Sequence, residues 1–272
     1  MSLRFDPIGR RLVARPVLVM AMACLLLATR AVHASPIIDV SPGTSPAGYL
    51  PLALFGIAPI AGVGDETIHD FNVPAFLYAG EVWSHVRMAS NGYVVVGAGT
   101  GAGDIEFMNQ SLPDPLAPNN VLAPFWTDLN PSAGGELRIG TLTDGANTWI
   151  VLDWAAVREF STTRSATFEI WIGIDGDANP GEDITFAYGA IQGNGDGGFL
   201  TVGAEDKTGT VGDMRYYNGV GTLPGDGTQL RVTTRDLPVV EAVPEPATLA
   251  LLGLGLAGLA AKRRTRRVTG RG

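Results

Sequence analysis

Glycine, proline, asparagine and aspartate interrupt this chain every few residues between Ser35 and Val243. Because of these interruptions, no apolar pattern with the 3.6-residue period of a helix runs long enough to form one. What remains are short runs of alternating apolar and polar residues bounded by turn formers, which are typical of β-strands. The body of the chain is therefore predicted to be all-β.

Three pairs of alternating runs predict β-hairpins. The clearest pair is joined by Asn91-Gly92, a dipeptide that favours a tight two-residue turn, and the second pair is joined by Asp144-Gly145. A glycine- and aspartate-rich loop joins the third. The pairs are residues 82–88 with 93–96, 136–142 with 148–154, and 166–174 with 183–188. Further short strands are expected at residues 121–125, 200–204, 214–217 and 229–233.

About nine or ten short, regularly spaced strands predict a single antiparallel β-sandwich or jelly-roll-like domain over residues 35–237. The facing apolar rows of its two sheets would form the core. Residues 35–72 are richer in proline and glycine and are expected to form an irregular N-terminal extension packed across the sandwich. Residues 238–246 form a short, stiff linker.

Five short motifs in the body resemble, in order, the landmarks of nidogen-like (NIDO-type) extracellular domains. They are residues 91–93 (NGY), 122–129 (LAPFWTDL), 135–140 (GELRIG), 148–151 (TWIV) and 167–170 (TFEI). Residues 56–223 also resemble non-catalytic modules that follow the protease domain of some secreted bacterial subtilisin-like enzymes. The NIDO resemblance implies a role in matrix or adhesion, that is, interaction rather than chemistry.

The first 34 residues have the pattern of a secretory signal peptide. Four arginines precede an apolar stretch at residues 17–28, and Val32-His33-Ala34 offers a small-residue site for signal peptidase. Cleavage after Ala34 and Sec export are predicted. The alternative is an uncleaved anchor, but twelve apolar residues are fewer than the roughly twenty that span a bilayer. Cys24 is the only cysteine, so the mature protein would contain neither a thiol nor a disulfide.

The C-terminal thirty residues contain three parts in a fixed order. Pro244-Glu245-Pro246 precedes an uncharged apolar run at residues 247–261, and a basic tail follows at residues 262–272. The apolar run predicts a transmembrane helix, whose end the basic residues would hold on the cytoplasmic side. Those anchoring residues are Lys262, Arg263, Arg264, Arg266 and Arg267.

This order of parts resembles the sorting signal of PEP-CTERM proteins. The resemblance implies recognition and cleavage by an exosortase, in bacteria that also make exopolysaccharide. Fifteen residues of helix reach only about 22 Å, whereas a hydrocarbon core is about 30 Å thick, so the span suits a temporary hold in the inner membrane. The alternative is a lasting tether there.

The net charge of −8 conceals an uneven distribution. Residues 1–34 carry +4 and the tail after Pro246 carries +6, so residues 35–246 carry −18. A body this acidic repels nucleic acid and anionic lipid, and no nucleic-acid partner is expected. The surface charge serves either solubility or the binding of cations.

The loop after residue 174 crowds carboxylates and an amide into a few positions. Oxygen ligands of this kind suit calcium, and the spacing of the first three matches the start of a calcium-binding loop. Pro180 and Phe186 then occupy positions where an EF-hand needs Gly and Glu, so only a looser site is compatible with the sequence. The alternative is a solvated turn. The candidate ligands are Asp175, Asp177, Asn179, Glu182 and Asp183.

Trp126 and Asp128 lie in an LAPFWTDL run and could present a ring and a carboxylate to a sugar. The alternative for each tryptophan of the body is a place in the core. Trp149 and Trp154 are five residues apart on one predicted strand, so they should face opposite sides of the sheet.

No residue pattern indicates catalysis. His69 and His85 are the only histidines that remain after export, and the chain has no Gly-x-Ser-x-Gly nucleophile motif. The sequence therefore predicts a non-enzymatic, exosortase-sorted protein of the cell envelope or extracellular matrix. Its role would be structural or adhesive, with exopolysaccharide or matrix proteins as partners. The alternatives are a calcium-dependent carbohydrate-binding module and a secreted hydrolase.

Overall fold

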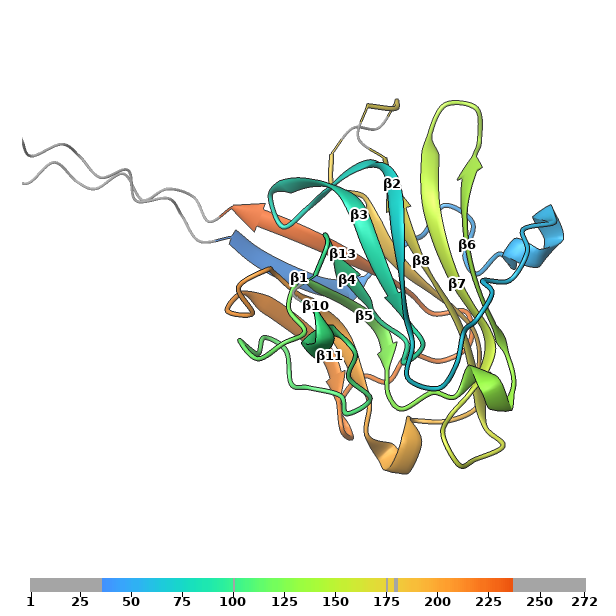
Figure 1. The fold of residues 1–272 in the computed structure, drawn as a ribbon. Helices are drawn as coiled ribbons and strands as arrows, with labels where there is room; N and C mark the ends of the chain where they lie inside the picture. The colour runs from blue at the N-terminus through green and yellow to red at the C-terminus, as the bar shows by residue number, and fades with distance from the viewer. Residues whose placement is uncertain (1–35, 100, 175, 179–180, 237–272) are drawn as a thin grey trace, which may run out of the picture. The chain divides into compact units, whose positions relative to one another are not determined.

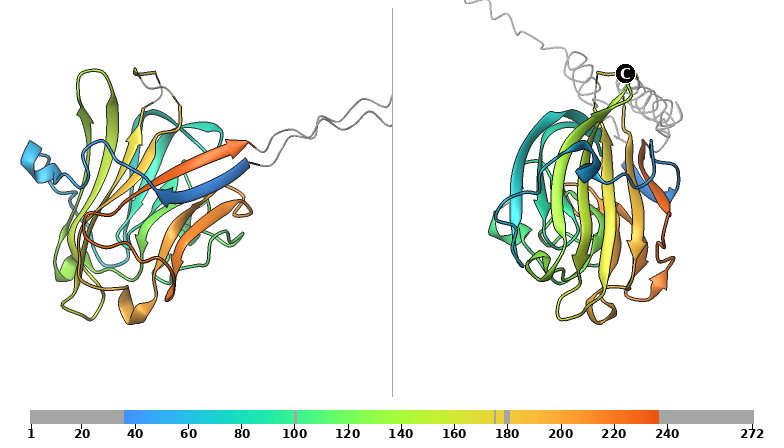
Figure 2. Two further views of the ribbon diagram at one scale, coloured as in Figure 1. Left: turned by 180° about the vertical axis from the view of Figure 1, so that it is seen from behind. Right: turned by 90° about the vertical axis from the view of Figure 1, so that its right-hand side faces the viewer.

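The computed structural model describes residues 36–99, 101–174, 176–178 and 181–236. They lie within residues Ala34–Pro238, which form one compact unit. Two antiparallel sheets pack face to face in this unit (Figures 1 and 2), as expected for an all-β sandwich. The only helices among the described residues are short 3-10 turns. They are η1 (Leu52–Phe55), η2 (Ala102–Asp104), η3 (Pro131–Ala133) and η4 (Asp196–Gly198).

The first sheet has six strands and the second has seven. In spatial order, the first sheet contains β1 (Pro36–Pro42), β13 (Gln229–Asp236), β9 (Ile184–Ile191), β8 (Ser165–Gly173), β7 (Thr148–Arg158) and β6 (Glu136–Thr143). The second contains β12 (Val220–Gly221), β11 (Gly212–Tyr217), β10 (Thr201–Glu205), β5 (Val121–Trp126), β4 (Val94–Val96), β3 (Glu81–Ala89) and β2 (Ile68–Tyr78).

All three predicted hairpins are present. Strand β3 pairs with β4, β6 pairs with β7, and β8 pairs with β9, each in antiparallel register. In the first hairpin the turn glycine cannot be replaced without strain. Gly92 has a φ of +78°, and a Cβ at this position would lie 2.0 Å from the carbonyl oxygen of Phe125.

The described residues contain thirteen strands, more than the nine or ten expected. Strands β1, β2 and β12 were not predicted. Strand β1 lies wholly, and β2 partly, within residues 35–72. The expectation of an irregular extension there was therefore wrong in part. Strand β1 pairs with β13, which is formed by the last described residues. Strand β2 contains Pro74 at a bulge, and it tolerates this proline because it is an edge strand of the second sheet.

Aromatic side chains fill the space between the sheets. Phe168 stacks on Trp154 and on Phe125, with ring centroids 5.1 Å and 5.5 Å apart. Polar ends of core aromatics also bridge the layers: Trp154 donates from Nε1 to the Ala89 carbonyl at 3.0 Å, and the Tyr188 hydroxyl donates to the Pro124 carbonyl at 2.7 Å. These bonds satisfy groups that would otherwise be costly to bury.

A segment after β1 crosses the outer face of the first sheet, as the rear view in Figure 2 shows. We call residues 44–57 the strap. Leu52, at the start of η1, is fully buried against Trp149, Val151, Trp171 and Ala187. The strap therefore covers part of the outer face of the first sheet and forms a small second core there.

No helix within the described ranges has the length and apolar character that a membrane crossing requires. The predicted signal peptide, residues 1–34, and the predicted transmembrane segment, residues 247–261, lie outside the described residues.

Candidate functional site

A cleft of about 750 Å³ lies on the outer face of the first sheet. The strap forms one wall, and residues of the β6–β7 hairpin, of β8 and the loop after it, and of the first part of β13 contribute the rest. Strap residues Ser45, Leu50, Phe55 and Ile57 face Thr141, Leu142, Thr143, Asp144, Asn147, Trp149, Trp171, Asp183 and Arg231 across it. A volume of this size lies within the range typical of small-molecule sites.

Two tryptophans form the floor of the cleft. Trp149 on β7 and Trp171 on β8 meet edge to face, with ring centroids 6.1 Å apart and planes at 69°. Trp154, five residues after Trp149, points into the core between the sheets instead. The prediction that these two rings face opposite sides is therefore confirmed. Trp149 is 9% exposed and Trp171 is 2% exposed, because the strap covers most of both rings.

Arg231 and Asp183 form an ion pair at one end of the cleft. The guanidinium Nη1 lies 2.8 Å from Asp183 Oδ1, and Trp149 donates from Nε1 to the other carboxylate oxygen at 3.2 Å. Arg231 also donates to the Glu182 carbonyl at 3.2 Å. The charges of this pair offset each other, so it fixes the wall without adding net charge to the cleft.

Two buried carboxylates anchor the strap to the sheet. Asp153 accepts hydrogen bonds from the Tyr49 hydroxyl and from the Leu52 N–H, both at 3.2 Å. Glu169 accepts from the Leu50 N–H at 3.0 Å and from the Trp171 indole at 2.9 Å, both on Oε2. The strap therefore depends on side chains that the strand pattern places on the outer face of β7 and β8.

Burial strongly affects the ionisation of both carboxylates. It raises the pKa of Glu169 to about 9, and the neighbouring Asp153 charge adds to the rise. Burial also raises the pKa of Asp153 to about 6, although Arg138 and the bonds from Leu52 and Tyr49 oppose the shift. Glu169 is therefore protonated at neutral pH. Sequence patterning did not reveal this pair, which sits opposite in register within two alternating runs.

Trp126 cannot stack on a sugar. Its ring is fully buried, packs on Tyr93 at a centroid distance of 4.6 Å, and donates from Nε1 to the Glu106 carbonyl at 3.1 Å. The suggestion of an accessible ring at this position is wrong and the alternative, a place in a core, is confirmed, because the side chain fills a small core on the outer face of the second sheet. Asp128 lies at the edge of a separate cleft of about 310 Å³, beside Phe107 and Phe199.

Asp128 belongs to the one acidic group in the described part of the chain whose geometry could hold a metal ion. One ligand oxygen from each of Asp65, Glu66 and Asp128 lies within 4.8 Å of the others. Burial, followed by the charges of Glu66, Asp65 and Asp196, raises the pKa of Asp128 to about 6. No local sequence pattern indicates this group, because Asp65 and Asp128 are far apart along the chain.

The acidic loop proposed for calcium is only partly described, because Asp175 and Asn179 lie outside the described residues. The three remaining candidates all bond to the body of the domain. Asp177 accepts from the Thr148 N–H at 2.8 Å, and Glu182 accepts from the Ala79 N–H at 3.0 Å. Asp183 is held by Arg231. These carboxylates tie the loop to the sandwich.

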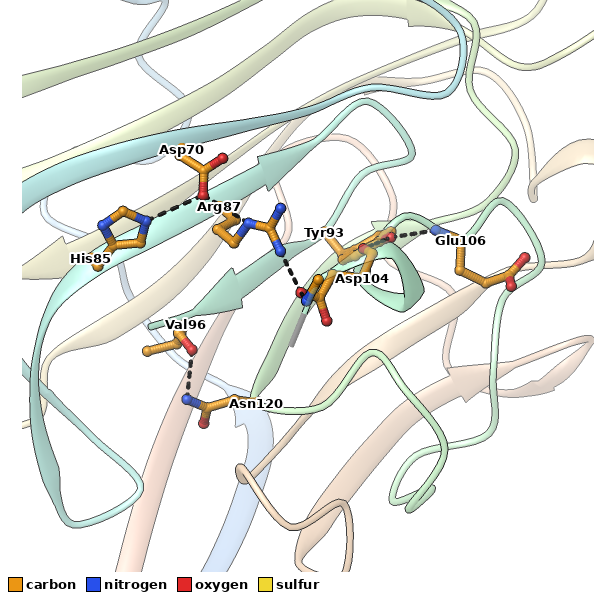
Figure 3. A network of polar contacts seen from close by, with 9 residues as sticks. Asp70, His85, Arg87, Tyr93, Val96, Asp104, Glu106 and Asn120 are labelled. Carbon is orange, nitrogen blue, oxygen red and sulfur yellow. Dashed lines mark hydrogen bonds and ion pairs between the residues drawn. The ribbon is translucent and has the colours of Figure 1, made fainter. Parts of the chain in front are cut away.

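His85 belongs to a polar network on the outer face of the second sheet (Figure 3). Its ring nitrogens lie 3.3 Å from Asp70 and 3.2 Å from Asn72, while Arg87 links Asp70 to the buried Asp104. The Tyr93 hydroxyl donates to the Asp104 carbonyl at 2.6 Å and accepts from the Glu106 N–H at 2.8 Å. The network fastens the long loop between β4 and β5 to the sheet.

The residues predicted for sorting lie outside the described part of the chain. They are Pro244, Glu245 and Pro246 of the cleavage motif, and Lys262, Arg263, Arg264, Arg266 and Arg267 of the basic tail. Their assignment rests on the sequence alone.

Comparison with known proteins finds two matches, and together they cover the body and the tail. A family model described as NIDO related matches residues 54–235. A second, described as the PEP-CTERM protein-sorting motif, matches residues 242–264. No curated protein and no solved structure matches the chain. The first match spans more than half of the 272 residues and the whole of the cleft except the first part of the strap.

Proposed function

This chain belongs to the NIDO-related family and carries a PEP-CTERM sorting motif, and from that premise we propose a structural or adhesive role in an exopolysaccharide matrix. The NIDO and PEP-CTERM resemblances seen in the sequence are confirmed by the family matches. The sorting motif implies an exported protein that an exosortase processes on its way to the cell envelope. The body that it delivers is a single β-sandwich with a large outer cleft.

The sorting motif is the observation that carries the proposal. It implies the export of a strongly acidic domain to the cell envelope, and this supports a role in interactions with what surrounds the cell. The cleft supports an adhesive role, because its polar rim and aromatic floor suit a matrix component. We further propose that the domain is not an enzyme. In support, the ring nitrogens of His85 bond to Asp70 and Asn72 rather than to a hydroxyl nucleophile.

Processing is tested in the producing bacterium with and without its exosortase. In the wild type we expect a shortened chain in the outer envelope or the medium, and in the exosortase deletion a longer chain in the inner membrane. Replacing Pro244, Glu245 and Pro246 together by alanine should reproduce the deletion. A chain whose size and location are the same in all three strains would contradict the sorting step.

The adhesive role is tested separately, by deleting the gene for this chain alone. The expected result is a weaker matrix, measured as cells and polysaccharide released from a biofilm under shear. Complementation with the full chain should restore it, whereas complementation with the triple-alanine variant should not. An unchanged release of cells would contradict the role and leave the sorting result intact.

A further inference from the structure

We propose that the cleft between the strap and the β6–β7 hairpin binds a short segment of a neutral polysaccharide. This inference names the ligand class of the adhesive role, and it rests on the proposed function for the claim that the protein meets polysaccharide outside the cell. The binding site itself follows from the geometry of the cleft, which can be tested on the isolated protein.

The apolar surfaces of the cleft suit the faces of sugar rings. Leu142, Trp149 and Trp171 line the cleft, but the two tryptophan rings are almost fully buried, so Phe55 of the strap is the aromatic ring on which a sugar can stack. Phe55 is 52% exposed, although η1 is held down by the fully buried Leu52 three residues earlier. An aromatic ring kept in solvent on a well-anchored turn is available for stacking.

The polar groups of the rim suit hydroxyls. Thr141, Thr143 and Asn147 line the cleft, and the Asn147 side-chain oxygen is buried with no hydrogen-bond partner among the described residues. That oxygen has almost no solvent-accessible surface, so a ligand in the cleft cannot reach it. The exposed residues Thr141 and Thr143 instead offer hydroxyl groups that can exchange hydrogen bonds with sugar hydroxyls.

Charge decides which class of glycan fits. Asp183 and Arg231 neutralise each other at 2.8 Å, which leaves Asp144 as the one unpaired charge among the described residues that line the cleft. The surrounding body carries −18. A polyuronate or a phosphorylated glycan would meet repulsion both from this wall and from the whole domain. The ligand is therefore a neutral glycan.

Binding is tested on the full chain, purified in a zwitterionic detergent that carries no sugar. The probes are neutral glucan and mannan oligosaccharides of six units, with an oligouronate of equal length as the charged control. All five tryptophans of the chain lie in the described body, so intrinsic fluorescence reports on this domain. We expect a saturable change with at least one neutral oligosaccharide and none with the oligouronate.

A matched pair of variants locates the site. Phe55→Ala removes a ring at the cleft mouth, whereas Leu54→Ala removes an adjacent side chain that is 74% exposed and does not line the cleft. Both positions are exposed, so neither change should unfold the protein. Phe55→Ala should weaken binding about tenfold, which corresponds to about 1.4 kcal/mol, and Leu54→Ala should leave it unchanged.

Three outcomes would overturn the inference: no response to any neutral oligosaccharide, equal effects of the two strap variants, or preferred binding of the oligouronate. Each is distinct from a failure of the proposed function. A chain that is sorted normally and strengthens the matrix, yet binds no neutral glycan, contradicts this inference alone.

Discussion

Glu169 illustrates how one buried side chain can serve the fold at a cost. It is fully buried on the outer face of β8, opposite Asp153 in register, and Arg138 lies opposite Asp153 on the next strand. Its Oε2 accepts two hydrogen bonds that hold the strap and the Trp171 ring, while Oε1 has no partner among the described residues. The proton that Glu169 retains at neutral pH avoids a second negative charge beside Asp153.

The raised pKa of Glu169 predicts a pH-dependent stability. Because that pKa is about 9 when folded and near 4.5 when unfolded, the folded state binds the proton more tightly. The contribution of Glu169 is therefore fully present below about pH 4.5 and is lost as the pH rises toward 9, by up to about 1.4 kcal/mol per pH unit. Glu169→Gln keeps the acceptor for both donors and should remove this slope.

Thermal melts of the full chain, followed by tryptophan fluorescence between pH 5 and pH 9, measure the effect. The variant should lose less stability than the wild type as the pH rises, and it should be the more stable protein at pH 8. Glu81→Gln, which removes an exposed carboxylate paired with Lys207, is the matched control and should follow the wild type. Parallel profiles for wild type and Glu169→Gln would contradict the assignment.

At the residue scale, sequence patterns predicted which side chains lie on strands better than they predicted whether each side chain is buried. Trp126 and Trp149 both stand in short apolar runs, yet one is sealed in a small core and the other lines a cleft. Asp153 and Glu169 look like the outward polar residues of two strands. Only the strap, which comes from residues about one hundred positions earlier, turns that outward face into an interior.

At the scale of elements, the hairpins were predictable because their information is local. Asn91-Gly92 and Asp144-Gly145 set the turn and hence the register of the strands beside them. Strand β1 has no such partner nearby, since it pairs with β13 almost two hundred residues later. The cleft has the same origin. Its walls come from the strap, β6, β7, β8 and β13, which no spacing rule brings together.

The strap should behave as a separable element held by Leu52. This side chain is fully buried against the two floor tryptophans, so Leu52→Ala should destabilise the protein by about 2–5 kcal/mol. Loosening of the strap should also expose Trp149 and Trp171 to acrylamide quenching and open residues 44–57 to proteolysis. Leu54→Ala, on the same turn but 74% exposed, should leave the stability, the quenching and the cleavage pattern of the wild type.

The idea that the strap is a separable element would be contradicted if Leu52→Ala lowered stability while the quenching and cleavage patterns of the folded protein stayed those of the wild type. In that case the loss would be spread over the whole sandwich, and the strap would be an integral part of the first sheet.

At the scale of the whole molecule, the two ends of the body meet. Pro36 pairs with Asp236 where β1 and β13 run side by side, and Figure 1 shows both ends of the described chain at this edge. Both predicted processing sites therefore connect to the domain at the same edge. The pairing also limits where the chain can be cut, because β1 supplies Ile38 and Val40 to the core between the sheets.

This constraint predicts the mature N-terminus. Cleavage after Ala34 leaves Ser35 as the first residue and keeps all of β1, from Pro36 to Pro42, whereas a cut a few residues later would remove buried side chains from the core. Mass spectrometry of the protein from the producing bacterium should find Ser35 at its start. As a control, a chain engineered to begin at Ser41 should melt at a lower temperature. In that chain β13 would lose its partner along most of one edge, and Ile38 and Val40 would be missing from the core. A natural N-terminus inside β1, or a truncated chain as stable as the mature protein, would contradict this account of how export and fold fit together.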